Sequence, residues 1–335
     1  MKVLITGSAG FIGFHLAKVL LAEGFTVHGY DGLTDYYDPV LKNNRHKILM
    51  TNPNFTATIG MLEDEKKLYS TAKEFKPAII IHLAAQAGVR YSLENPRSYI
   101  DSNIIGTFNV MEAARKEKIK HLLMASTSSV YGANVKMPFI EKEKTDSQLT
   151  IYAATKKANE SMAHSYAYLW KIPTTMFRFF TVYGPWGRPD MALFKFASAI
   201  INNKPIDIYN QGEMYRDFTY IDDLVHSIYL LINKIPFNSS DTENLSKDNV
   251  SPVAPYRVVN IGNSTKIKLL DFIEIVEDVI GKKAIRNYMP MQKGDVMSTW
   301  ADTSVLQNLT GYHPKTNVKD GVKNFVNWYR KYYNN

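Results

Sequence analysis

Short apolar runs alternate with amphipathic stretches through the first half of the chain. Such runs, partly β-branched, are typical of strands buried on both faces of a parallel sheet, and they occupy residues 2–6, 26–30, 78–83, 121–125 and 173–178. Helical periodicity lies between them, at residues 14–23, 99–117 and 150–170. This alternation predicts an α/β protein with a doubly wound parallel sheet, the Rossmann fold. Ligands should bind at the carboxyl ends of its strands.

The second half of the chain is less regular, and its pattern loosens after about residue 184. It predicts helices at residues 192–202, 269–280 and 321–333, a strand at 258–261 that returns to the sheet, and a polar surface insertion at 236–255. We expect residues 1–183 to form the Rossmann domain, with segments at about 217–235 and 257–264 returning to it. Residues 184–335 would mainly form a smaller, mixed α/β C-terminal lobe that binds the substrate.

A glycine-rich turn, GSAGFIG at residues 7–13, joins the first strand to the first helix. Its glycines allow a tight turn and a close approach to a pyrophosphate, which the amides at the helix N-terminus would face. The spacing is GxxGxxG rather than GxGxxG, and a lone glycine-rich turn can be purely structural. Here Asp31 ends the second strand, where a carboxylate binds ribose hydroxyls and repels a 2′-phosphate. The combination predicts an NAD site.

Tyr152 and Lys156 lie four residues apart in a predicted helix, so both side chains share one face. A nearby ammonium favours a phenolate. A tyrosine titrates near ~10, so a base that works near neutrality needs a shift of roughly 3 units, about 4 kcal/mol. The same spacing also occurs in exposed helix turns. Its combination with a dinucleotide turn favours a catalytic pair.

Composition narrows the class of protein. The 335 residues, 45% of them hydrophobic, can form one large core or two unequal domains. The chain has no cysteine, which excludes disulfides and thiolate chemistry. It starts directly with a strand rather than a signal pattern, and no apolar run reaches the ~18 residues of a membrane span. We expect a cytoplasmic protein that does not bind a membrane.

The net charge of +8 comes from scattered lysines without a stripe or a nucleic-acid-binding motif, so no nucleic-acid partner is expected. Modest basicity usually serves solubility, although an anionic nucleotide sugar would also fit it. No metal site is expected.

Several motifs together resemble the extended short-chain dehydrogenase/reductase family. They lie at residues 6–13, 83–92, 126–132, 152–156, 178–190, 216–223 and 294–296. The chain is most similar to the nucleotide-sugar 4-epimerases, in particular the UDP-glucuronate 4-epimerases of bacterial capsule and lipopolysaccharide synthesis. The resemblance implies an isomerase that uses tightly held NAD. It would interconvert UDP-glucuronate and UDP-galacturonate through a transient 4-keto sugar.

By this resemblance, Tyr152 is the general base, and Lys156 positions the cofactor ribose and lowers the pKa of Tyr152. Thr127 completes the catalytic trio. A hydroxyl at this position can donate to and accept from the substrate oxygen that is oxidised. The alternative for Thr127, Ser128 and Ser129 is a strand-end turn that satisfies its own backbone.

The resemblance also implies contact residues. The cofactor contacts would be Gly7, Gly10, Phe11, Ile12, Gly13, Asp31, Leu62, Leu83, Ala84, Ala85, Asn103, Tyr152 and Lys156. A core leucine and a capping asparagine are the alternatives for Leu62 and Asn103. The substrate contacts would be Arg90, Thr127, Ser128, Ser129, Thr181, Arg188, Arg216 and Asp295.

The residues after Thr127 discriminate between related reactions. Related 4,6-dehydratases carry an Asp-Glu pair there, and UDP-glucuronate decarboxylases carry a glutamate at the position of Ser129. This chain has neither acid. We therefore expect oxidation and re-reduction at one carbon.

The remaining substrate contacts follow from the sugar and its diphosphate. Thr181 replaces the asparagine of the UDP-galactose enzyme, and its hydroxyl can bind a uronate carboxylate. Arg90 and Arg188 suit anionic groups, with a plain surface arginine as the alternative. The chain departs from galactose epimerases at Gln292, where they have an arginine; Lys293 is the candidate to replace it.

Two other functions remain open at this point. One is a 4-epimerase of a UDP-N-acetylhexosamine or of its uronic acid. The other is a non-catalytic NAD-binding protein, against which the intact Thr127, Tyr152 and Lys156 argue. Family members often pair two helices into a four-helix dimer interface, so residues 99–117 and 152–170 predict a homodimer.

Overall fold

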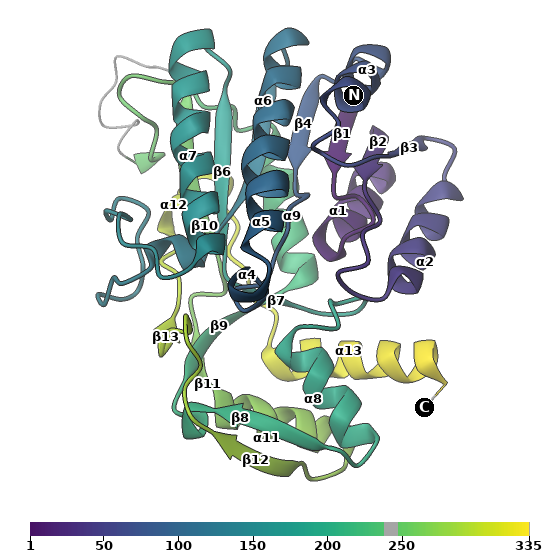
Figure 1. The fold of residues 1–335 in the computed structure, drawn as a ribbon, viewed down its shortest axis with the longest axis vertical. Helices are drawn as coiled ribbons and strands as arrows, with labels where there is room; N and C mark the ends of the chain where they lie inside the picture. The colour runs from purple at the N-terminus through teal and green to yellow at the C-terminus, as the bar shows by residue number, and fades with distance from the viewer. Residues whose placement is uncertain (238–246, 335) are drawn as a thin grey trace.

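Seven parallel strands form the central sheet, in the order β10-β6-β5-β4-β1-β2-β3 (Figure 1). The structure, a computed structural model, describes residues 1–237 and 247–334, so residues 238–246 of the predicted insertion lie outside the described residues. The strands are β1 (Lys2–Thr6), β2 (Thr26–Asp31), β3 (Phe55–Ile59), β4 (Ile79–His82), β5 (His121–Thr127), β6 (Thr174–Phe179) and β10 (Tyr256–Ile261). The predicted doubly wound fold and the returning strand at 258–261 are confirmed.

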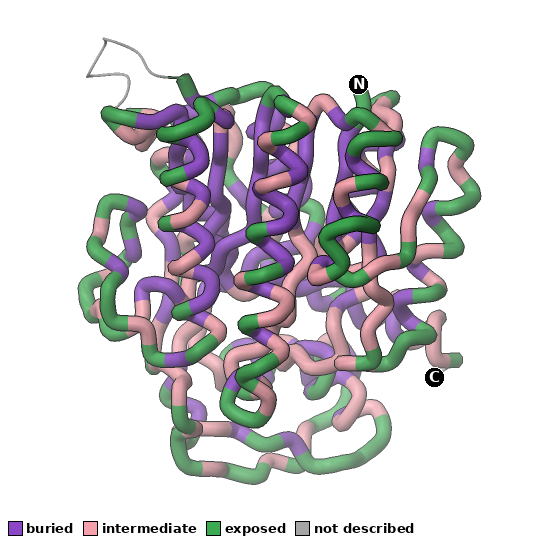
Figure 2. The backbone as a smooth tube through the Cα atoms, turned by 45° about the horizontal axis from the view of Figure 1, so that its top comes forward, coloured by how far each residue is buried: buried purple, intermediate pink, exposed green. Residues whose placement is uncertain are grey.

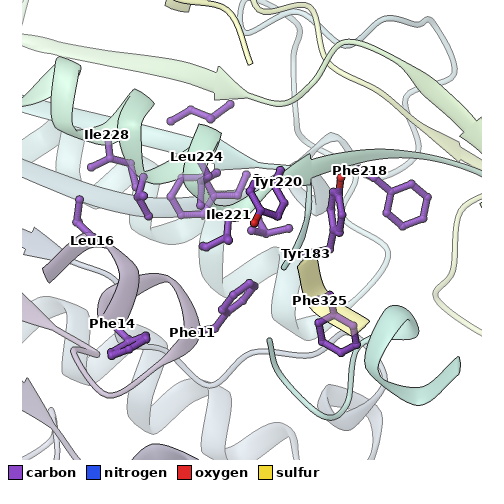
Figure 3. Packing of buried hydrophobic residues seen from close by; sticks show 14 of the residues in the cluster. Phe11, Phe14, Leu16, Tyr183, Phe218, Tyr220, Ile221, Leu224, Ile228 and Phe325 are labelled. Atoms are coloured by element: carbon purple, nitrogen blue, oxygen red, sulfur yellow. The ribbon is translucent and has the colours of Figure 1, made fainter. Parts of the chain in front are cut away.

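Helices cover both faces of this sheet. They are α1 (Phe11–Ala22), α2 (Pro39–Met50), α3 (Glu65–Phe75), α6 (Thr107–Lys116), α7 (Ile151–Trp170) and α9 (Ile221–Ile232). Side chains of a strand alternate between its two faces. Val3 and Ile5 of β1 therefore join the apolar layer under α1 and α9, whereas Leu4 joins the layer under α3, α6 and α7. Figure 3 shows part of the first layer, where Leu16 of α1 lies near Leu224 and Ile228 of α9.

The predicted helix 99–117 is not one regular helix. It begins with a π-helical segment, η1 (Ile100–Gly106), which follows the short helices α4 (Tyr91–Glu94) and α5 (Pro96–Tyr99) and continues into α6. π-Helical turns are rare and occur often at functional sites. Here the segment carries Asn103 to the carboxyl edge of the sheet.

A smaller lobe lies beyond the carboxyl ends of the strands (Figure 1). Its outer layer pairs β8 (Pro205–Tyr209) with β12 (Ile285–Met289), backed by α8 (Ala192–Ile201) and α11 (Leu269–Ile280). A mixed sheet joins it to the larger unit: β9 (Tyr215–Tyr220) pairs with β7 (Thr181–Tyr183), β11 (Lys266–Lys268) and β13 (Ser298–Thr299). The remaining elements are η2 (Ser128–Tyr131), η3 (Asn210–Gly212), α12 (Ser304–Thr310) and α13 (Val318–Tyr333). The boundary at residue 183 stays a prediction.

The buried residues follow the sheet and the inner faces of its helices, while exposed residues gather at the turns (Figure 2). Among the described residues, no helix combines the length and the apolar character needed to cross a bilayer.

Candidate active site

A cavity of about 1020 Å³ opens at the carboxyl edge of the sheet, between the two lobes. Its lining gathers residues that are far apart in the sequence. Of the predicted site residues it includes Gly7, Gly10, Phe11, Ile12, Gly13, Asp31, Leu62, Leu83, Ala84, Ala85, Thr127, Ser128, Ser129, Tyr152, Lys156, Thr181, Arg188, Arg216 and Asp295. Arg90 and Asn103 are the two that do not line it.

At one end of the cavity the glycine turn brings two backbone segments together. Gly7 has φ +77°, and a Cβ there would lie 2.7 Å from the amide nitrogen of Ala84. The Gly10 amide donates to the Gly7 carbonyl at 3.0 Å, and Gly10 is the N-cap of α1. Phe11 and Ile12, which line the cavity, start the helix, so their amides have no partner within it. This geometry suits a pyrophosphate.

The Asp31 carboxylate is fixed beside this turn. It accepts hydrogen bonds from the backbone amides of Ala9 at 2.9 Å and Leu33 at 2.8 Å. Each carboxylate oxygen can accept further bonds. Asp31 therefore presents a rigid acceptor to the cavity, as a ribose-binding acid requires.

Tyr152 and Lys156 both line the cavity from α7, which begins after its N-cap Thr150. The Lys156 ammonium donates to the carbonyl of Ala125 at 2.9 Å, and burial lowers the pKa of Lys156 to about 8 against the raising effect of the Glu160 charge. Burial also raises the pKa of Tyr152, opposed by the Thr127 hydroxyl and the Arg188 charge. The effect of Lys156 on the pKa of Tyr152 stays a prediction; in this structure Nζ is engaged with the Ala125 carbonyl.

Thr127 ends β5 and begins a tight turn. Its Oγ1 accepts from the amide of Ser129 at 3.2 Å and donates to the Ser129 hydroxyl at 3.3 Å. The alternative of a strand-end turn is thus realised, yet Thr127, Ser128 and Ser129 all line the cavity as well. This wall offers hydroxyls and no acid.

The predicted cationic contacts are all engaged with the chain itself. Arg90 forms an ion pair with Asp295 at 3.2 Å, and its guanidinium lies 4.4 Å from the ring centroid of Tyr209. Arg216 donates to the carbonyls of Tyr215 at 2.8 Å and Met297 at 3.2 Å. Two residues predicted as separate substrate contacts, Arg90 and Asp295, therefore lie against each other at the rim.

A second ion pair involves Arg188 of the cavity lining. Arg188 forms an ion pair with Asp190 at 2.5 Å, so this predicted contact also has a partner within the chain.

Asn103 supports the cavity from behind. Its fully buried amide accepts from the backbone nitrogen of Gln86 at 2.8 Å and donates to the Gln86 carbonyl at 3.0 Å and to Thr155 at 3.1 Å. It thereby fixes the loop after β4 to α7. A role in direct cofactor contact stays a prediction.

Sequence reasoning missed several lining residues. Tyr36 and Lys42 line the cavity, and the Lys42 ammonium donates to Thr34 at its carbonyl (2.5 Å) and its hydroxyl (3.0 Å). Tyr99 does not line the cavity but packs edge-on against Tyr152, with ring centroids 6.0 Å apart. The signal available for the first two was their position just after Asp31. In the described part of the chain, no group of three candidate metal ligands occurs.

Comparison with known proteins agrees with this geometry. Residues 4–325 match the family described as GDP-mannose 4,6 dehydratase. The chain is 55% identical over 334 residues to a probable UDP-glucuronate 4-epimerase of Rhizobium meliloti (strain 1021), covering 99% of this chain and 98% of that relative. It is 50% identical over 333 residues to protein CapI of Staphylococcus aureus, covering 99% of both.

Among solved structures, the UDP-glucuronic acid 4-epimerase of Bacillus cereus in complex with UDP-glucuronic acid and NAD superposes with a TM-score of 0.88. It is 30% identical and covers 99% of this chain and 100% of that chain. The fold and site thus define an extended short-chain dehydrogenase/reductase. Within that class, the chain belongs to the GDP-mannose 4,6 dehydratase family.

Proposed function

We propose that this protein is an NAD-dependent 4-epimerase that interconverts UDP-glucuronate and UDP-galacturonate. The observation that carries the proposal is that Tyr152 shares one cavity with the glycine turn and with a wall of hydroxyls free of acids, Thr127 to Ser129. A dehydratase or a decarboxylase would need an acid on that wall to act at C5. The names of the relatives and of the Bacillus cereus complex point to the same reaction.

The cavity fits NAD. The pyrophosphate would lie on the amides that start α1, where Gly7 leaves no room for a side chain, and Asp31 would bind the adenosine ribose. NAD, when bound, would accept the hydride from C4 and return it to the other face of that carbon. Lys156, buried beside Ala125, would hold the nicotinamide ribose.

Tyr152 would exchange the proton. Its phenolate would take the proton of the C4 hydroxyl as the hydride leaves, and would give it back to the C4 oxygen on the return. The Thr127 hydroxyl would bind the same oxygen. Because burial raises the pKa of Tyr152, a positive charge near the phenol is needed to form the phenolate. The Arg188 charge acts in that direction, and its ion pair with Asp190 offsets part of this effect.

The remaining polar residues would bind the nucleotide. Arg216 would contact a phosphate and Asp295 the uridine ribose, with Arg90 beside it. These roles require the Arg90–Asp295 ion pair either to break when the nucleotide binds or to bind the nucleotide with its remaining donors and acceptors.

The 4-keto uronate is a β-keto acid, which loses CO2 when its carboxylate bond aligns with the carbonyl π system. We propose that Thr127, Ser128, Ser129 and Thr181 keep the carboxylate out of that alignment by hydrogen bonding. Thr181→Ala should weaken UDP-glucuronate binding and increase UDP-pentose. If Thr181→Ala shows neither weaker binding nor more UDP-pentose, the proposed role is wrong.

The direct test is to incubate the purified protein with UDP-glucuronate and no added cofactor, and to follow the anomeric protons by NMR. UDP-galacturonate should form without lasting NADH absorbance, and UDP-N-acetylglucosamine should turn over much more slowly. A UDP-pentose as the main product, or faster turnover of the N-acetylated sugar, would overturn the proposal. Tyr152→Phe is the inactive control.

We further propose a homodimer. Large apolar side chains are exposed on η1 and α6 (Ile100 41%, Ile105 41%, Phe108 44%) and at the end of α7 (Tyr168 50%, Leu169 61%, Trp170 45%). Their burial against a second copy would be favourable. Light scattering should give twice the chain mass, and Phe108→Glu should give a monomer. A monomeric wild type would contradict the proposed homodimer.

The cytoplasmic location stays a prediction.

A further inference from the structure

Arg188 does not face the cavity as a free cation. Its Nε donates to Oδ1 of Asp190 at 3.0 Å, and its Nη2 donates to Oδ2 at 2.5 Å. The side chains are 21% and 25% exposed. Asp190 thus binds both donors on one edge of the planar guanidinium. These two donors could otherwise form a bidentate pair with a ligand carboxylate.

Asp190 is itself held by a third residue. The Tyr36 hydroxyl donates to Oδ2 of Asp190 at 3.2 Å. The Tyr36 ring packs on Tyr91 with centroids 4.8 Å apart, and its hydroxyl occupies the space that a side chain at Gly88 would fill. Tyr36 therefore connects the segment after Asp31 to the loop after β4 and to Asp190.

The protonation states of Asp190 and Tyr36 follow from their surroundings. Burial raises the pKa of Asp190, but the Arg188 guanidinium more than offsets it, so the net pKa lies below its ordinary value. Burial and the Asp190 charge raise the pKa of Tyr36 to about 12, so its hydroxyl remains a donor. Arg188 and Asp190 together form a neutral pair with fixed donors rather than a net positive centre.

The pair lies at the reacting end of the cavity. Arg188 lines it together with Tyr152 and Thr181. The Arg188 charge also acts on Tyr152, where it lowers the phenol pKa against the effect of burial. A sugar held with its C4 hydroxyl at Tyr152 would place its other substituents within reach of Arg188.

The proposed reaction makes an unusual demand on a carboxylate site. The 4-keto sugar must present both faces of C4 in turn, so its carboxylate must be bound in two orientations. A free guanidinium would form a bidentate pair with the carboxylate in one of the two orientations. Because this binding stabilises one orientation of the sugar, it would slow the rotation to the other.

We propose that Asp190, held by Tyr36, is a positioning residue that occupies one edge of Arg188 and offsets its charge, so that the cavity binds a sugar carboxylate without fixing it in one orientation. This inference rests on the proposed 4-epimerase function.

The test compares Asp190→Asn and Tyr36→Phe with the wild type as NAD-bound proteins. Affinities for UDP-glucuronate and for neutral UDP-glucose are measured by calorimetry in a Tyr152→Phe background, which prevents turnover. Asp190→Asn should tighten UDP-glucuronate by about 10-fold, the scale of one charge-assisted hydrogen bond, and leave UDP-glucose unchanged. With Tyr152 present, it should lower kcat by about the same factor. Tyr36→Phe should also tighten UDP-glucuronate binding and lower kcat, each by a smaller factor.

The matched controls are Tyr229→Phe and Glu23→Gln. Tyr229→Phe removes, and Glu23→Gln weakens, an exposed hydroxyl–carboxylate hydrogen bond of 3.0 Å outside the cavity. Neither variant should change the affinity for UDP-glucuronate or kcat. The effect of Asp190→Asn should also vanish in an Arg188→Gln background. If Asp190→Asn weakens UDP-glucuronate, or tightens both ligands equally, the inference is wrong and Asp190 only holds Arg188 in place. Failure of the proposed function would instead appear as a wild type that forms no UDP-galacturonate, whatever the affinities.

Discussion

Glu160 and Arg178 form a bidentate ion pair in which each side chain is only 3% exposed. The two bonds are 2.9 and 2.8 Å long, and the Ser126 hydroxyl adds a third to Glu160 at 2.7 Å. Glu160 lies one helical turn beyond Lys156. The pair therefore ties the helix that carries Tyr152 and Lys156 to β5 and β6.

Glu160→Gln should destabilise the protein strongly. The change leaves the Arg178 charge buried without a counter-ion, which costs about 3–5 kcal/mol of unfolding free energy. Glu65→Gln, at an exposed pair with Lys116 whose atoms are 3.8 Å apart, should cost less than about 1 kcal/mol. Urea denaturation measures both. Similar small losses in the two variants would mean that the buried pair contributes little to stability.

Gly7→Ala and Gly24→Ala separate backbone strain from lost space. The two glycines have nearly equal φ, +77° and +78°, but a Cβ at Gly7 meets the Ala84 backbone whereas a Cβ at Gly24 has nothing within 4 Å. Gly24→Ala should cost about 1 kcal/mol and retain NAD. Gly7→Ala should lose NAD, because the turn must open to admit the methyl group.

The measurement is the NAD released by acid from the folded fraction of each variant, collected by gel filtration. Equal NAD contents in Gly7→Ala and Gly24→Ala would contradict the placement of the pyrophosphate on this turn.

The contribution of Glu141 to stability should fall as pH rises from about 4.5 to about 7. This buried carboxyl accepts from the amide of Asn260 at 2.8 Å, and burial raises its pKa to about 7. Since the folded pKa is the higher one, its contribution is complete below about pH 4.5 and is lost by about pH 7. The shift corresponds to about 3 kcal/mol.

Glu141→Gln should therefore lack this contribution, so the unfolding free energy of the variant relative to the wild type should increase between about pH 5 and pH 8. Asp217, whose pKa burial raises to about 6, should contribute a smaller loss of the same sign in both proteins. Urea denaturation at the two pH values tests this. An unchanged slope in Glu141→Gln would show that Glu141 does not carry it.

The sequence predicts the sheet well because strands buried on both faces must be continuous apolar runs. The predicted strand 2–6 and helix 269–280 coincide with β1 and α11. The π-helical segment η1 could not be predicted, because its seven residues are too few for their periodicity to be told from that of an α-helix.

The sequence predicts the contacts within the site less completely than it predicts the sheet. The local motifs locate Tyr152 and Asp31, since each depends on a spacing within one element. The Arg90–Asp295 pair joins residues 205 positions apart, which no spacing rule can connect. The engagement of Lys156 with Ala125 likewise depends on how α7 packs on β5, so no spacing rule could predict it.

The most direct test of the proposed chemistry is the fate of the C4 hydrogen. UDP-glucuronate labelled with deuterium at C4 is incubated with the protein in ordinary water, and the product is examined by NMR. If one carbon is oxidised and re-reduced within the cavity, UDP-galacturonate should retain the deuterium at C4. Loss of the label to solvent, or its appearance in a UDP-pentose, would contradict the account.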